Sequence, residues 1–478
     1  MVLRGRGRRH LNLRAGLRAG ATLKNHHIRS VDPMSDLMRS AMPGVVWPAI
    51  TDDRAAQALA LQFQFEQSQW WPLERLQAQQ LKQFQSVFRH AVATVPYYRD
   101  RYAAVTEISD WQDFSSLPVI TRREVQLAGD AMHSEAPPSE HGSIISTQSS
   151  GSTASPLVTK GTVWTQLLWN AFLLRDHLWQ RRDFRGKLAA IRSKTVDGAA
   201  RDWGMATRAF VTGPSAVLGL TADIDEQVRW LESERPDYLL SLATNTRALA
   251  KRSLELGVRL QGLKQVRTFG ETLQPDTRDI VRSAWGVDVV DSYSSEELGY
   301  IALQCPEHEH YHVQSEGLLV EVLNEDGSAS VPGEVGRVVV STLHNFAMPL
   351  LRYSSGDYAE VGDSCACGRG LPVLNRIAGR QRNMMVRPDG VRHWPSFPIS
   401  AWAQAAPVLQ LQLVQHEIDH IDAFVVLRRD FADDEPLRLI EALQGCLGYP
   451  FRITLKKVEE ISRSAGGKYE DFVSLISQ

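Results

Sequence analysis

The sequence predicts an α/β protein with a large N-terminal domain and a small α/β C-terminal domain. In the larger part, short apolar runs such as 188–191 and 238–241 alternate with helical stretches, a pattern typical of buried parallel strands joined by helices. After about residue 380, a shorter pattern of strand, hairpin, helix and strand begins. The length of 478 residues is enough for two or more domains.

The composition narrows the classes of partner. Hydrophobic residues make up 43% and charged residues 23% of the chain, which is ordinary for a globular protein. The 53 basic and 55 acidic residues nearly cancel, so no overall field favours nucleic acid or a membrane surface. No apolar run approaches the ~18 residues that a spanning helix needs. We therefore expect a cytoplasmic protein without a nucleic-acid partner or a membrane span.

The first 33 residues differ from the rest. Residues 1–31 contain eight Arg and Lys residues, and no acidic residue precedes Asp32. An organelle-targeting peptide is similarly basic, but Gly and Arg alternate here without a clear apolar face. We expect a disordered basic arm, or an extension upstream of a natural start at Met34, and we leave it out of the fold.

Within the large domain, residues 34–380, the first elements are predicted to be helical. Apolar residues recur at three- and four-residue spacings from 52 to about 102, which favours helices. The stretch 117–121 is expected to be extended and to lead into a helix. A loop rich in Ser, Thr and Gly follows at 146–155, and strands then alternate with helices as far as Gly286.

The pattern changes after Gly286. Strand-like runs separated by Gly, Pro and Asp turns predict a small β-rich subdomain at about 287–378. The stretch 379–383 is a candidate hinge, and the small, mobile C-terminal domain is expected at 383–478. The expected strands of the β-rich subdomain are 287–290, 317–323 and 336–342, and the expected C-terminal elements are strands 409–414, 423–427 and 453–458 and a helix at 437–447.

The loop from Ser146 to Pro156 can carry chemistry. Its small residues and hydroxyls let a backbone wrap closely around an anion, with amide N–H groups donating to phosphate oxygens. It is not a Walker loop, because no Gly-Lys-Ser/Thr follows at the required spacing. A surface loop without a ligand is the alternative.

Three further segments carry polar groups suited to a nucleotide. Glu296 and Glu297 follow the strand 287–290, where a carboxylate can hold Mg²⁺ at the carboxyl end of a sheet; the alternative is an acidic helix N-terminus. Asp357, in an expected turn next to Gly356, can accept both hydroxyls of a ribose. Lys468, after two glycines, can bring its charge to a developing phosphate anion, although a solvated surface lysine is the default.

Taken together, these segments and their order resemble the acyl-adenylate-forming superfamily. The resemblance is closer to the phenylacetate–CoA ligase-like branch, which includes relatives from capsular polysaccharide biosynthesis, and it runs from about Gln80 to Phe472. The segments that support it are the loop from Ser146, Val95–Arg99, Leu117–Thr121, Thr268–Leu273, Tyr293 to Gly299, Arg352 to Asp357, Gly379-Arg380 and Gly467-Lys468.

This resemblance implies a large adenylate-forming domain and an ATP-dependent, AMP-forming ligase that activates a carboxylic acid and passes it to CoA as a thioester. Lys468 and Glu297 are then the catalytic residues, and Glu297 binds Mg²⁺. The residues expected to bind ATP are Ser149, Ser150, Gly151, Ser152 and Thr153 at the β- and γ-phosphates, Gly270 and Glu271 beside the adenine, Tyr293 stacked near it, Asp357 at the ribose and Arg380 close by.

The acceptor is less constrained than the activation step. The hinge of the family usually carries a pair of Asp residues, and Arg382 and Asn383 stand there instead. This departure favours an alternative in which the acyl group passes to a carrier-protein thiol, or to an amine or hydroxyl in a biosynthetic cluster. A degenerate, non-catalytic homologue is the third hypothesis, and the joint presence of Glu297, Asp357 and Lys468 argues against it.

Three of the four cysteines lie in two short polar segments, which favours a metal site over a disulfide framework. Cys305 and the pair Cys365 and Cys367, with one histidine, suit a closed tetrahedral site for structural Zn²⁺. The resemblance indicates His312 as the fourth ligand, whereas His308 offers a Cys-x-x-His spacing. Free thiols without a metal are the alternative.

The resemblance also indicates where the acid binds. Its pocket is expected near 164–172, 241–246 and 268–270, where Trp169, Phe172 and Phe269 suit an apolar acid, although they are equally good core residues. The identity of the acid is not predicted. A homodimer is expected from the resemblance alone.

Overall fold

The computed structural model describes residues 34–105, 107–148, 157–193, 195–395, 397, 402–461, 463 and 468–476. The predicted basic arm, 1–33, and the predicted phosphate loop, Ser149–Thr153, lie outside these residues. Residues 34–37 form a 3₁₀ helix, η1 (Met34–Leu37), in a separate N-terminal unit. The second unit begins at Met38 and contains every element discussed below.

The predicted helices of the first third are confirmed. They are α1 (Asp53–Ser68), α2 (Leu73–Thr94), α3 (Pro96–Arg101) and α4 (Trp111–Ser116). Helix α1 begins where the Asp52 carboxylate accepts hydrogen bonds from two backbone N–H groups of the first turn. Proline at position 96 ends α2 and occupies the first turn of α3, where its missing N–H costs nothing. Helix α2 buries Phe84, Val87 and Phe88 on one face, as their spacing predicts.

The extended stretch before residue 122 also forms as expected. Strand β1 (Ile120–Thr121) leads into α5 (Arg122–Ala128) through a capping box, in which the Thr121 hydroxyl and the Glu124 carboxylate each bond the other residue's backbone N–H. The first residues of the expected Ser/Thr-rich loop, 146–148, instead belong to strand β2 (Ile144–Gln148), which pairs antiparallel with β3 (Val158–Thr162). Single turns of 3₁₀ helix lie at η2 (Gly129–Met132), η3 (Ser139–His141) and η4 (Met205–Thr207).

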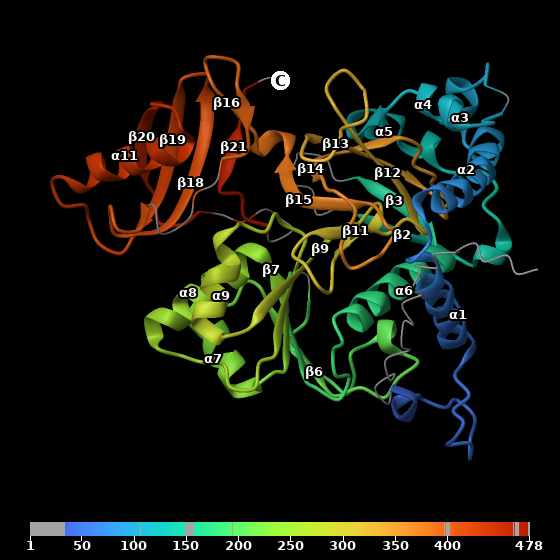
Figure 1. The fold of residues 1–478 in the computed structure, drawn as a ribbon. Coiled ribbons are helices and arrows are strands. Elements are labelled where there is room, and N and C mark those ends of the chain that lie inside the picture. The colour runs from blue at the N-terminus through green and yellow to red at the C-terminus, as the bar shows by residue number, and fades with distance from the viewer. Residues whose placement is uncertain are drawn as a thin grey trace, which may run out of the picture. The chain divides into compact units, whose positions relative to one another are not determined.

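The central part is a parallel sheet with helices on both sides. Its parallel strands are β4 (Leu188–Arg192), β6 (Ser215–Gly219), β7 (Tyr238–Leu242), β8 (Gln265–Phe269) and β9 (Asp288–Ser295), and β5 (Gly198–Ala200) is antiparallel at one edge. Figure 1 shows α7 (Ile224–Glu234), α8 (Ala243–Leu256) and α9 (Asp276–Trp285) on one side of this sheet and α6 (Val163–Trp179) on the other. The strands are buried apolar runs because both faces are covered.

The predicted β-rich region is present and is hydrogen-bonded to the parallel strands, so the two form one continuous sheet. Strand β9 makes this join, because it pairs in parallel with β8 and antiparallel with β10. The antiparallel strands are β10 (Gly299–Gln304), β11 (Tyr311–Val313), β12 (Leu318–Leu323), β13 (Val335–Thr342), β14 (Tyr353–Val361) and β15 (Val373–Arg380). Strand β1 adds to β14 in parallel, with Ile120 opposite Tyr353.

The C-terminal segment forms its own sheet, in the predicted order of elements. After η5 (Gln381–Asn383) come β16 (Met385–Val386), β17 (Arg392–His393), β18 (Val408–Glu417), β19 (His420–Leu427), α11 (Glu435–Leu447), β20 (Arg452–Lys457) and β21 (Phe472–Ser474). The larger sheet has the order β20-β19-β18-β21, and α11 packs Leu439 and Leu443 onto it. The predicted mixed α/β fold class is therefore confirmed.

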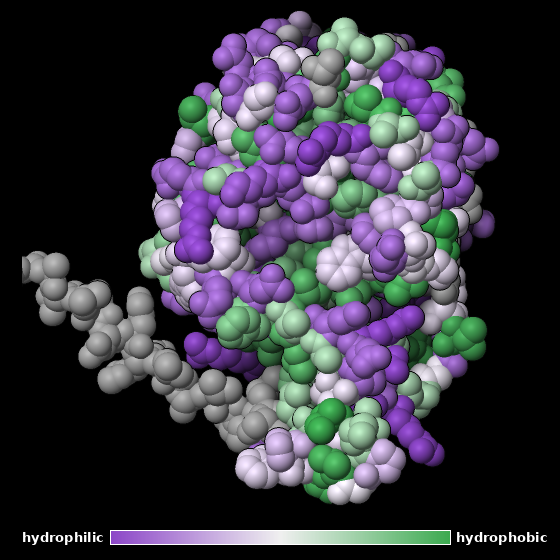
Figure 2. Space-filling model, turned by 90° about the vertical axis from the view of Figure 1, so that its right-hand side faces the viewer, coloured by the Kyte–Doolittle hydropathy of each residue, from purple (hydrophilic) through white to green (hydrophobic). Residues whose placement is uncertain are grey.

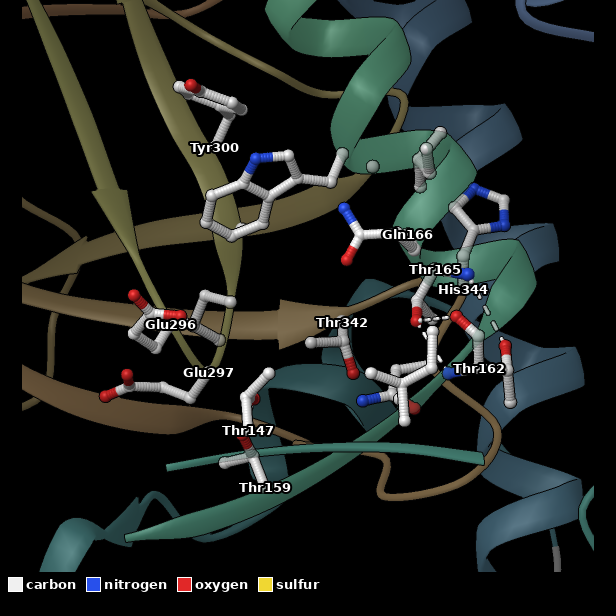
Figure 3. Close-up of a pocket in the computed structure, with 18 of the residues that line it drawn as sticks. Thr147, Thr159, Thr162, Thr165, Gln166, Glu296, Glu297, Tyr300, Thr342 and His344 are labelled. Atoms are coloured by element: carbon white, nitrogen blue, oxygen red, sulfur yellow. Dashed lines mark hydrogen bonds between the residues drawn. The ribbon is translucent and has the colours of Figure 1, made fainter. Parts of the chain in front are cut away.

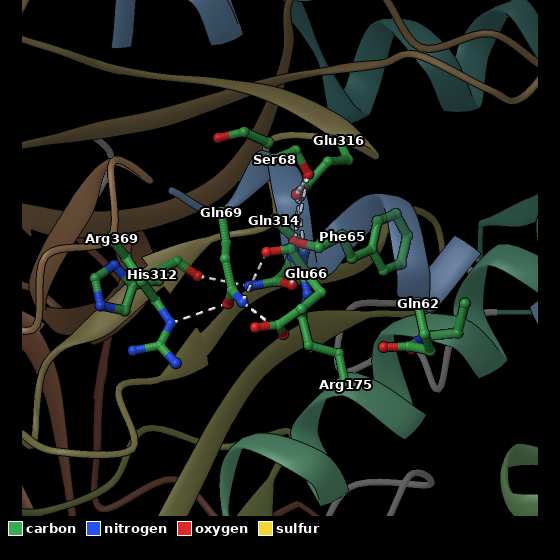
Figure 4. A network of polar contacts seen from close by, with 12 residues as sticks. Gln62, Phe65, Glu66, Ser68, Gln69, Arg175, His312, Gln314, Glu316 and Arg369 are labelled. Carbon is green, nitrogen blue, oxygen red and sulfur yellow. Dashed lines mark hydrogen bonds and ion pairs between the residues drawn. The ribbon is translucent and has the colours of Figure 1, made fainter. Parts of the chain in front are cut away.

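A buried arginine ties α6 to its surroundings (Figure 4). The Arg175 side chain is 2% exposed and donates to both carboxylate oxygens of Glu316, at 2.7 and 3.0 Å. It also donates to the Gln314 side chain and to the Phe65 carbonyl of α1. Burial alone would raise the pKa of Glu316, but the Arg175 charge holds it below its ordinary value. The network fixes α6 against α1 and the segment before β12.

The visible surface contains both hydrophilic and hydrophobic residues. Figure 2 shows hydrophilic residues over most of the visible face, with hydrophobic residues gathered near its lower end. Exposed apolar side chains in the segment that precedes α1 include Met42, Val46 and Trp47. Of the helices in the part of the chain that the structure describes, none has the length and apolar character needed to cross a membrane.

We predict that Arg175→Ala lowers the free energy of unfolding at pH 7 by about 3–5 kcal/mol, because it leaves the Glu316 charge buried and unpaired. Since Arg175 lowers the pKa of Glu316 in the folded state, the pair stabilises the protein above the ordinary Glu pKa, and that stability is lost as the pH falls. Urea unfolding of wild type and variant should therefore converge in acid.

Arg185→Ala is the matched control for this experiment, because Arg185 is exposed and lies 4.0 Å from an exposed Asp183. It should change the unfolding free energy little at either pH. A loss with Arg175→Ala that is the same at neutral and acid pH would contradict the assigned role of the ion pair.

Candidate functional site

One cavity of about 530 Å³ brings together predicted site residues from distant parts of the sequence. It lies at the carboxyl ends of β8 and β9, where ligands of α/β sheets bind. The segment 468–472 and the end of β15 complete its wall. The predicted residues that line it are Gly270, Glu271, Tyr293, Glu297, Asp357, Arg380 and Lys468.

The predicted adenine residues follow β8. Gly270 has a φ of 75°, a left-handed conformation that favours glycine, and a side chain there would point toward Lys468. The Glu271 carboxylate accepts hydrogen bonds from the Thr244 N–H and hydroxyl, at 2.8 and 2.7 Å, and from the Tyr469 N–H at 2.9 Å. Burial raises the pKa of Glu271, and these hydrogen bonds oppose the rise. Glu271 thus connects the start of α8 with the segment that carries Lys468.

Asp357 lies within strand β14, and not in the turn that the sequence suggested. Gly356, at a φ of 81°, allows the pairing of β14 with β13 to shift between Ser354 and Tyr358. The Tyr293 hydroxyl donates to Asp357 Oδ2 at 2.8 Å, and Arg380 Nε lies 3.3 Å from Oδ1. Burial raises the pKa of the Tyr293 phenol, and the Asp357 charge adds to the rise. Tyr293 therefore stays protonated and serves as a donor.

Glu297 lies in the tight turn between β9 and β10, so the alternative of a helix N-terminus is wrong. Its side chain is 7% exposed and accepts a hydrogen bond from Arg122 at 3.1 Å and a longer one from the Tyr353 hydroxyl at 3.4 Å. Glu296 is more exposed and also lines the cavity. Sequence reasoning missed Arg122, although it directly follows the recognised stretch Leu117–Thr121.

Lys468 is half-buried in the same cavity, so the default of a solvated surface lysine is wrong for its position. Burial lowers the pKa of its ammonium group, and the nearby Arg380 charge lowers it further. The carboxylates of Asp357, Glu271 and Glu297 act in the opposite direction. The lysine therefore lies among opposing charges, with three carboxylates that favour its protonated form.

A second cavity, of about 230 Å³, adjoins the first and shares Glu296 and Glu297 with it (Figure 3). Helix α6 contributes Trp169 and Phe172 to its wall, as expected for 164–172. The other two expected segments do not line it: Thr244 and Gly270 line the larger cavity instead. These two residues follow strands β7 and β8, whose ends border the larger cavity.

The wall of the smaller cavity is braced from behind. The Trp169 and Tyr300 rings lie 5.1 Å apart between centroids. The Tyr300 oxygen accepts a hydrogen bond from Arg267 at 2.8 Å, and Arg267 lies 3.0 Å from the fully buried Asp176 of α6. The Asp176 pKa is lowered, because the charges of Arg182 and Arg267 outweigh the effect of burial. Tyr300 is thus fixed by a buried charge network.

Sequence comparison identifies relatives of this chain among curated proteins. A phenylacetate–coenzyme A ligase from Thermus thermophilus is 26% identical over 300 residues, covering 55% of this chain and 67% of the relative. The Escherichia coli phenylacetate–coenzyme A ligase is 24% identical over 375 residues, covering 74% and 82%. This chain is a homologue of phenylacetate–CoA ligases. The predicted resemblance is confirmed, although no family model matches the chain.

Solved structures agree on the fold. A 2-hydroxyisobutyryl-CoA ligase in the postadenylation state superposes with a TM-score of 0.69 at 20% identity, covering 86% of this chain and 91% of that one. The same enzyme with an acyl-AMP and CoA in the thioesterification state gives a TM-score of 0.57. The fold of this homologue is therefore that of acyl-adenylate-forming CoA ligases.

The homologue also gathers cysteine and histidine side chains beside the adjoining strands β10, β11 and β15. Donor atoms of Cys305, His310, His312 and Cys365 all lie within 4.8 Å of one another. Cys367, a predicted ligand, lies next to this group, with its Sγ 3.4 Å from His312 Nε2. Sequence reasoning missed His310. Its spacing of two residues from His312 was a usable signal, because residues two apart in an extended chain point to the same side.

The other candidate, His308, does not enter this group of donor atoms in the part of the chain that the structure describes. Its ring stacks on that of His310, with centroids 5.2 Å apart. Of the two histidines that the sequence left open, the structure brings His312 to the cysteines.

Proposed function

We propose that this protein is an ATP-dependent, AMP-forming acid–CoA ligase. The observation that carries the proposal is the convergence of Glu297, Asp357 and Lys468 on one cavity, with a second cavity joined to it at Glu297. The first supplies groups suited to a nucleotide, and the second supplies space for an acid. Its homologues, the phenylacetate–CoA ligases, support the same chemistry.

In this proposal the nucleotide lies along β14 and β15. The Asp357 carboxylate accepts hydrogen bonds from both ribose hydroxyls, while Tyr293 and Arg380 hold it in place. Gly270, Glu271 and Tyr293 border the adenine, and the loop Ser149–Thr153 binds the β- and γ-phosphates. Glu297 is the proposed ligand of Mg²⁺, because a carboxylate oxygen is the donor that this ion prefers.

Lys468 is the proposed catalytic residue of the activation step. The acid carboxylate attacks the α-phosphorus of ATP, a new O–P bond forms, and the bond to pyrophosphate breaks. Negative charge increases on the α-phosphate oxygens in the transition state, and the Lys468 ammonium stabilises it. This requires the protonated lysine, so its lowered pKa makes the activation step fall off at a lower alkaline pH than an ordinary lysine would allow.

The acid is proposed to occupy the cavity between α6 and β10. Trp169, Phe172 and Tyr300 offer an apolar wall for its side chain, and its carboxylate then points past Glu297 toward the nucleotide cavity. The small volume, about 230 Å³, favours a compact acid over a long acyl chain.

In the second step, CoA is the proposed acceptor, and its thiolate attacks the acyl carbon and releases AMP. We propose that 34–380 forms the large domain, with its β-rich part at 287–378, and that 383–478 forms a small domain that rotates about the hinge between the steps. The Arg382 and Asn383 pair keeps a second candidate open, an acyl-adenylate passed to a carrier-protein thiol, an amine or a hydroxyl.

The test of the proposed function is pyrophosphate release with Mg·ATP across a panel of aryl and aliphatic acids, with and without CoA. We expect release that depends on one class of acid and is sustained only with CoA. Lys468→Ala should lower it by about a thousandfold while ATP still binds. Lys457→Ala, an exposed lysine of the same domain that pairs with Asp430, is the control and should change nothing.

Three outcomes separate the hypotheses. A burst of about one equivalent that CoA does not sustain would support another acceptor. Absence of both ATP binding and pyrophosphate release would contradict the proposed function. Full activity of Lys468→Ala would show that another residue stabilises the transition state.

Trp169 provides a test of the acid cavity. We predict that Trp169→Ala shifts preference toward larger acids and raises KM for the acid by about tenfold or more, without changing the KM for ATP. Trp164→Ala is the matched control, because Trp164 lies on the same helix but does not line the cavity. An equal effect of both variants would place the acid elsewhere.

We further propose that Cys305, His310, His312 and Cys365 hold a structural Zn²⁺. Two thiolates and two imidazoles at these separations suit its tetrahedral preference and leave no position for a reacting water. The ion would join β10, β11 and the loop before β15, and thereby stabilise this end of the antiparallel strands.

Zinc content measured by mass spectrometry should be about one per chain, and Cys365→Ser should remove most of it and lower Tm. Cys446→Ser is the control, because Cys446 packs in the C-terminal core, away from the cluster. Cys367→Ser tests the originally expected ligand: retained zinc supports the set with His310, and lost zinc supports the set with Cys367. Purified protein without zinc, whose Tm a chelator leaves unchanged, would contradict the site.

A further inference from the structure

The candidate hinge contains an ion pair to the segment that carries Lys468. Helical turn η5 (Gln381–Asn383) directly follows β15, and the Arg382 guanidinium donates to the Glu470 carboxylate. The two side chains are 21% and 24% exposed, so the pair is partly shielded from water. Glu470 lies two residues after Lys468, on the same extended segment. The arginine therefore contacts the proposed catalytic segment from the hinge itself.

The Glu470 charge acts on two arginines at the hinge, Arg382 and Arg380. Burial lowers the pKa of Arg382, and the Glu470 charge opposes this effect. Arg380, two residues earlier, is also within the field of Glu470 and pairs with Asp357 at 3.3 Å. The charges thus alternate in the order Asp357, Arg380, Glu470, Arg382. Such an arrangement attracts Glu470 toward the proposed ribose site and gives each arginine an acidic partner.

Hydrogen bonds to backbone groups also hold the segment 468–472. The Tyr469 N–H donates to Glu271 at 2.9 Å, and the Asn383 side chain donates to the Phe472 carbonyl at 2.6 Å. Residues 468–472 therefore contact η5 and the segment after β8, and the Asp471 carbonyl accepts a hydrogen bond from Leu413 of the C-terminal sheet. The Arg382–Glu470 ion pair adds a charged link between this segment and the hinge.

We propose that the Arg382–Glu470 ion pair positions Lys468 for the activation step and must break when segment 468–472 leaves the nucleotide cavity. This inference rests on the proposed function and adds a positioning role to two residues outside the reacting groups. It also gives a reason for Arg382 at the hinge, where an acidic residue was expected. The acidic partner, Glu470, lies on the segment that moves.

A double-mutant cycle tests the pair through the two half-reactions. Pyrophosphate release reports activation, with the acid that the panel above selects, and preformed acyl-adenylate with CoA reports transfer. We expect Glu470→Gln or Arg382→Gln to slow activation about tenfold and to leave transfer unchanged or faster. The double variant should be no slower than either single one, because both remove the same interaction, and Arg382→Lys should recover part of the rate.

A second measurement needs no substrate. Hydrogen exchange of the Tyr469 amide reports whether its bond to Glu271 is formed, and we expect exchange about tenfold faster in Glu470→Gln than in wild type. Arg387→Gln is the matched control, since Arg387 is an arginine just past the hinge that pairs with Asp389. It should leave exchange and both half-reactions unchanged.

Several results would overturn the inference. Single effects that multiply in the double variant would show that the residues act independently. Equal losses in activation and transfer, with a matching fall in Tm, would indicate a structural role alone. Unchanged Tyr469 exchange would show that the pair does not hold the segment, and this result stands even if the wild type proves inactive with every acid. The failure of the proposed function is thereby distinguished from the failure of the ion pair.

Discussion

The pairing of strand β9 is the constraint on which the site depends. Along one edge it continues the parallel sheet through β8, and along the other it begins the antiparallel part through β10. The turn that follows it carries Glu297 to the wall of the larger cavity, and Tyr300 then enters the wall of the smaller cavity. One hairpin therefore contributes side chains to both cavities at the point where they adjoin. Because both strands are buried, a shift of one residue in the register would reverse these side chains.

The charges of the site are balanced across elements that are distant in sequence. Glu297 is paired with Arg122 of α5, Asp357 with Arg380 of β15, and Lys468 lies in the field of three carboxylates. Half-buried charges of this kind are stable only when opposite charges or hydrogen bonds compensate them. The same balance keeps the larger cavity polar, while Trp169 gives the smaller cavity an apolar wall.

Support for this arrangement comes from behind the cavities. Arg175 fixes α6 to α1 and to the segment before β12, and Asp176 of the next helical position holds the arginine that contacts Tyr300. Two adjacent charged residues of α6 therefore bind different partners: Arg175 binds α1 and the segment before β12, and Asp176 binds Arg267. The wall of the smaller cavity therefore depends on these buried ion pairs, because Trp169 packs against the Tyr300 ring that they hold.

Local pattern was sufficient for much of the fold. The helices from 52 to 102, the capped entry at Thr121 and the order of the C-terminal elements follow from periodicity and turn chemistry, which neighbouring residues determine. The types of site residue were also accessible, because a resemblance in short motifs indicated Glu297, Asp357 and Lys468. The local structures around these residues were not predicted correctly. Glu297 lies in a hairpin turn and Asp357 in a strand, because pairing between strands decided both.

The sequence by itself determined the fold class, the elements and a set of candidate residues, because these depend on interactions between residues close along the chain. Only the tertiary structure decided which groups meet. Arg122 with Glu297, His310 with Cys365, and Arg382 with Glu470 are contacts between segments 55 to 175 residues apart. The physical reason is that such contacts depend on sheet order and register, which no local pattern specifies.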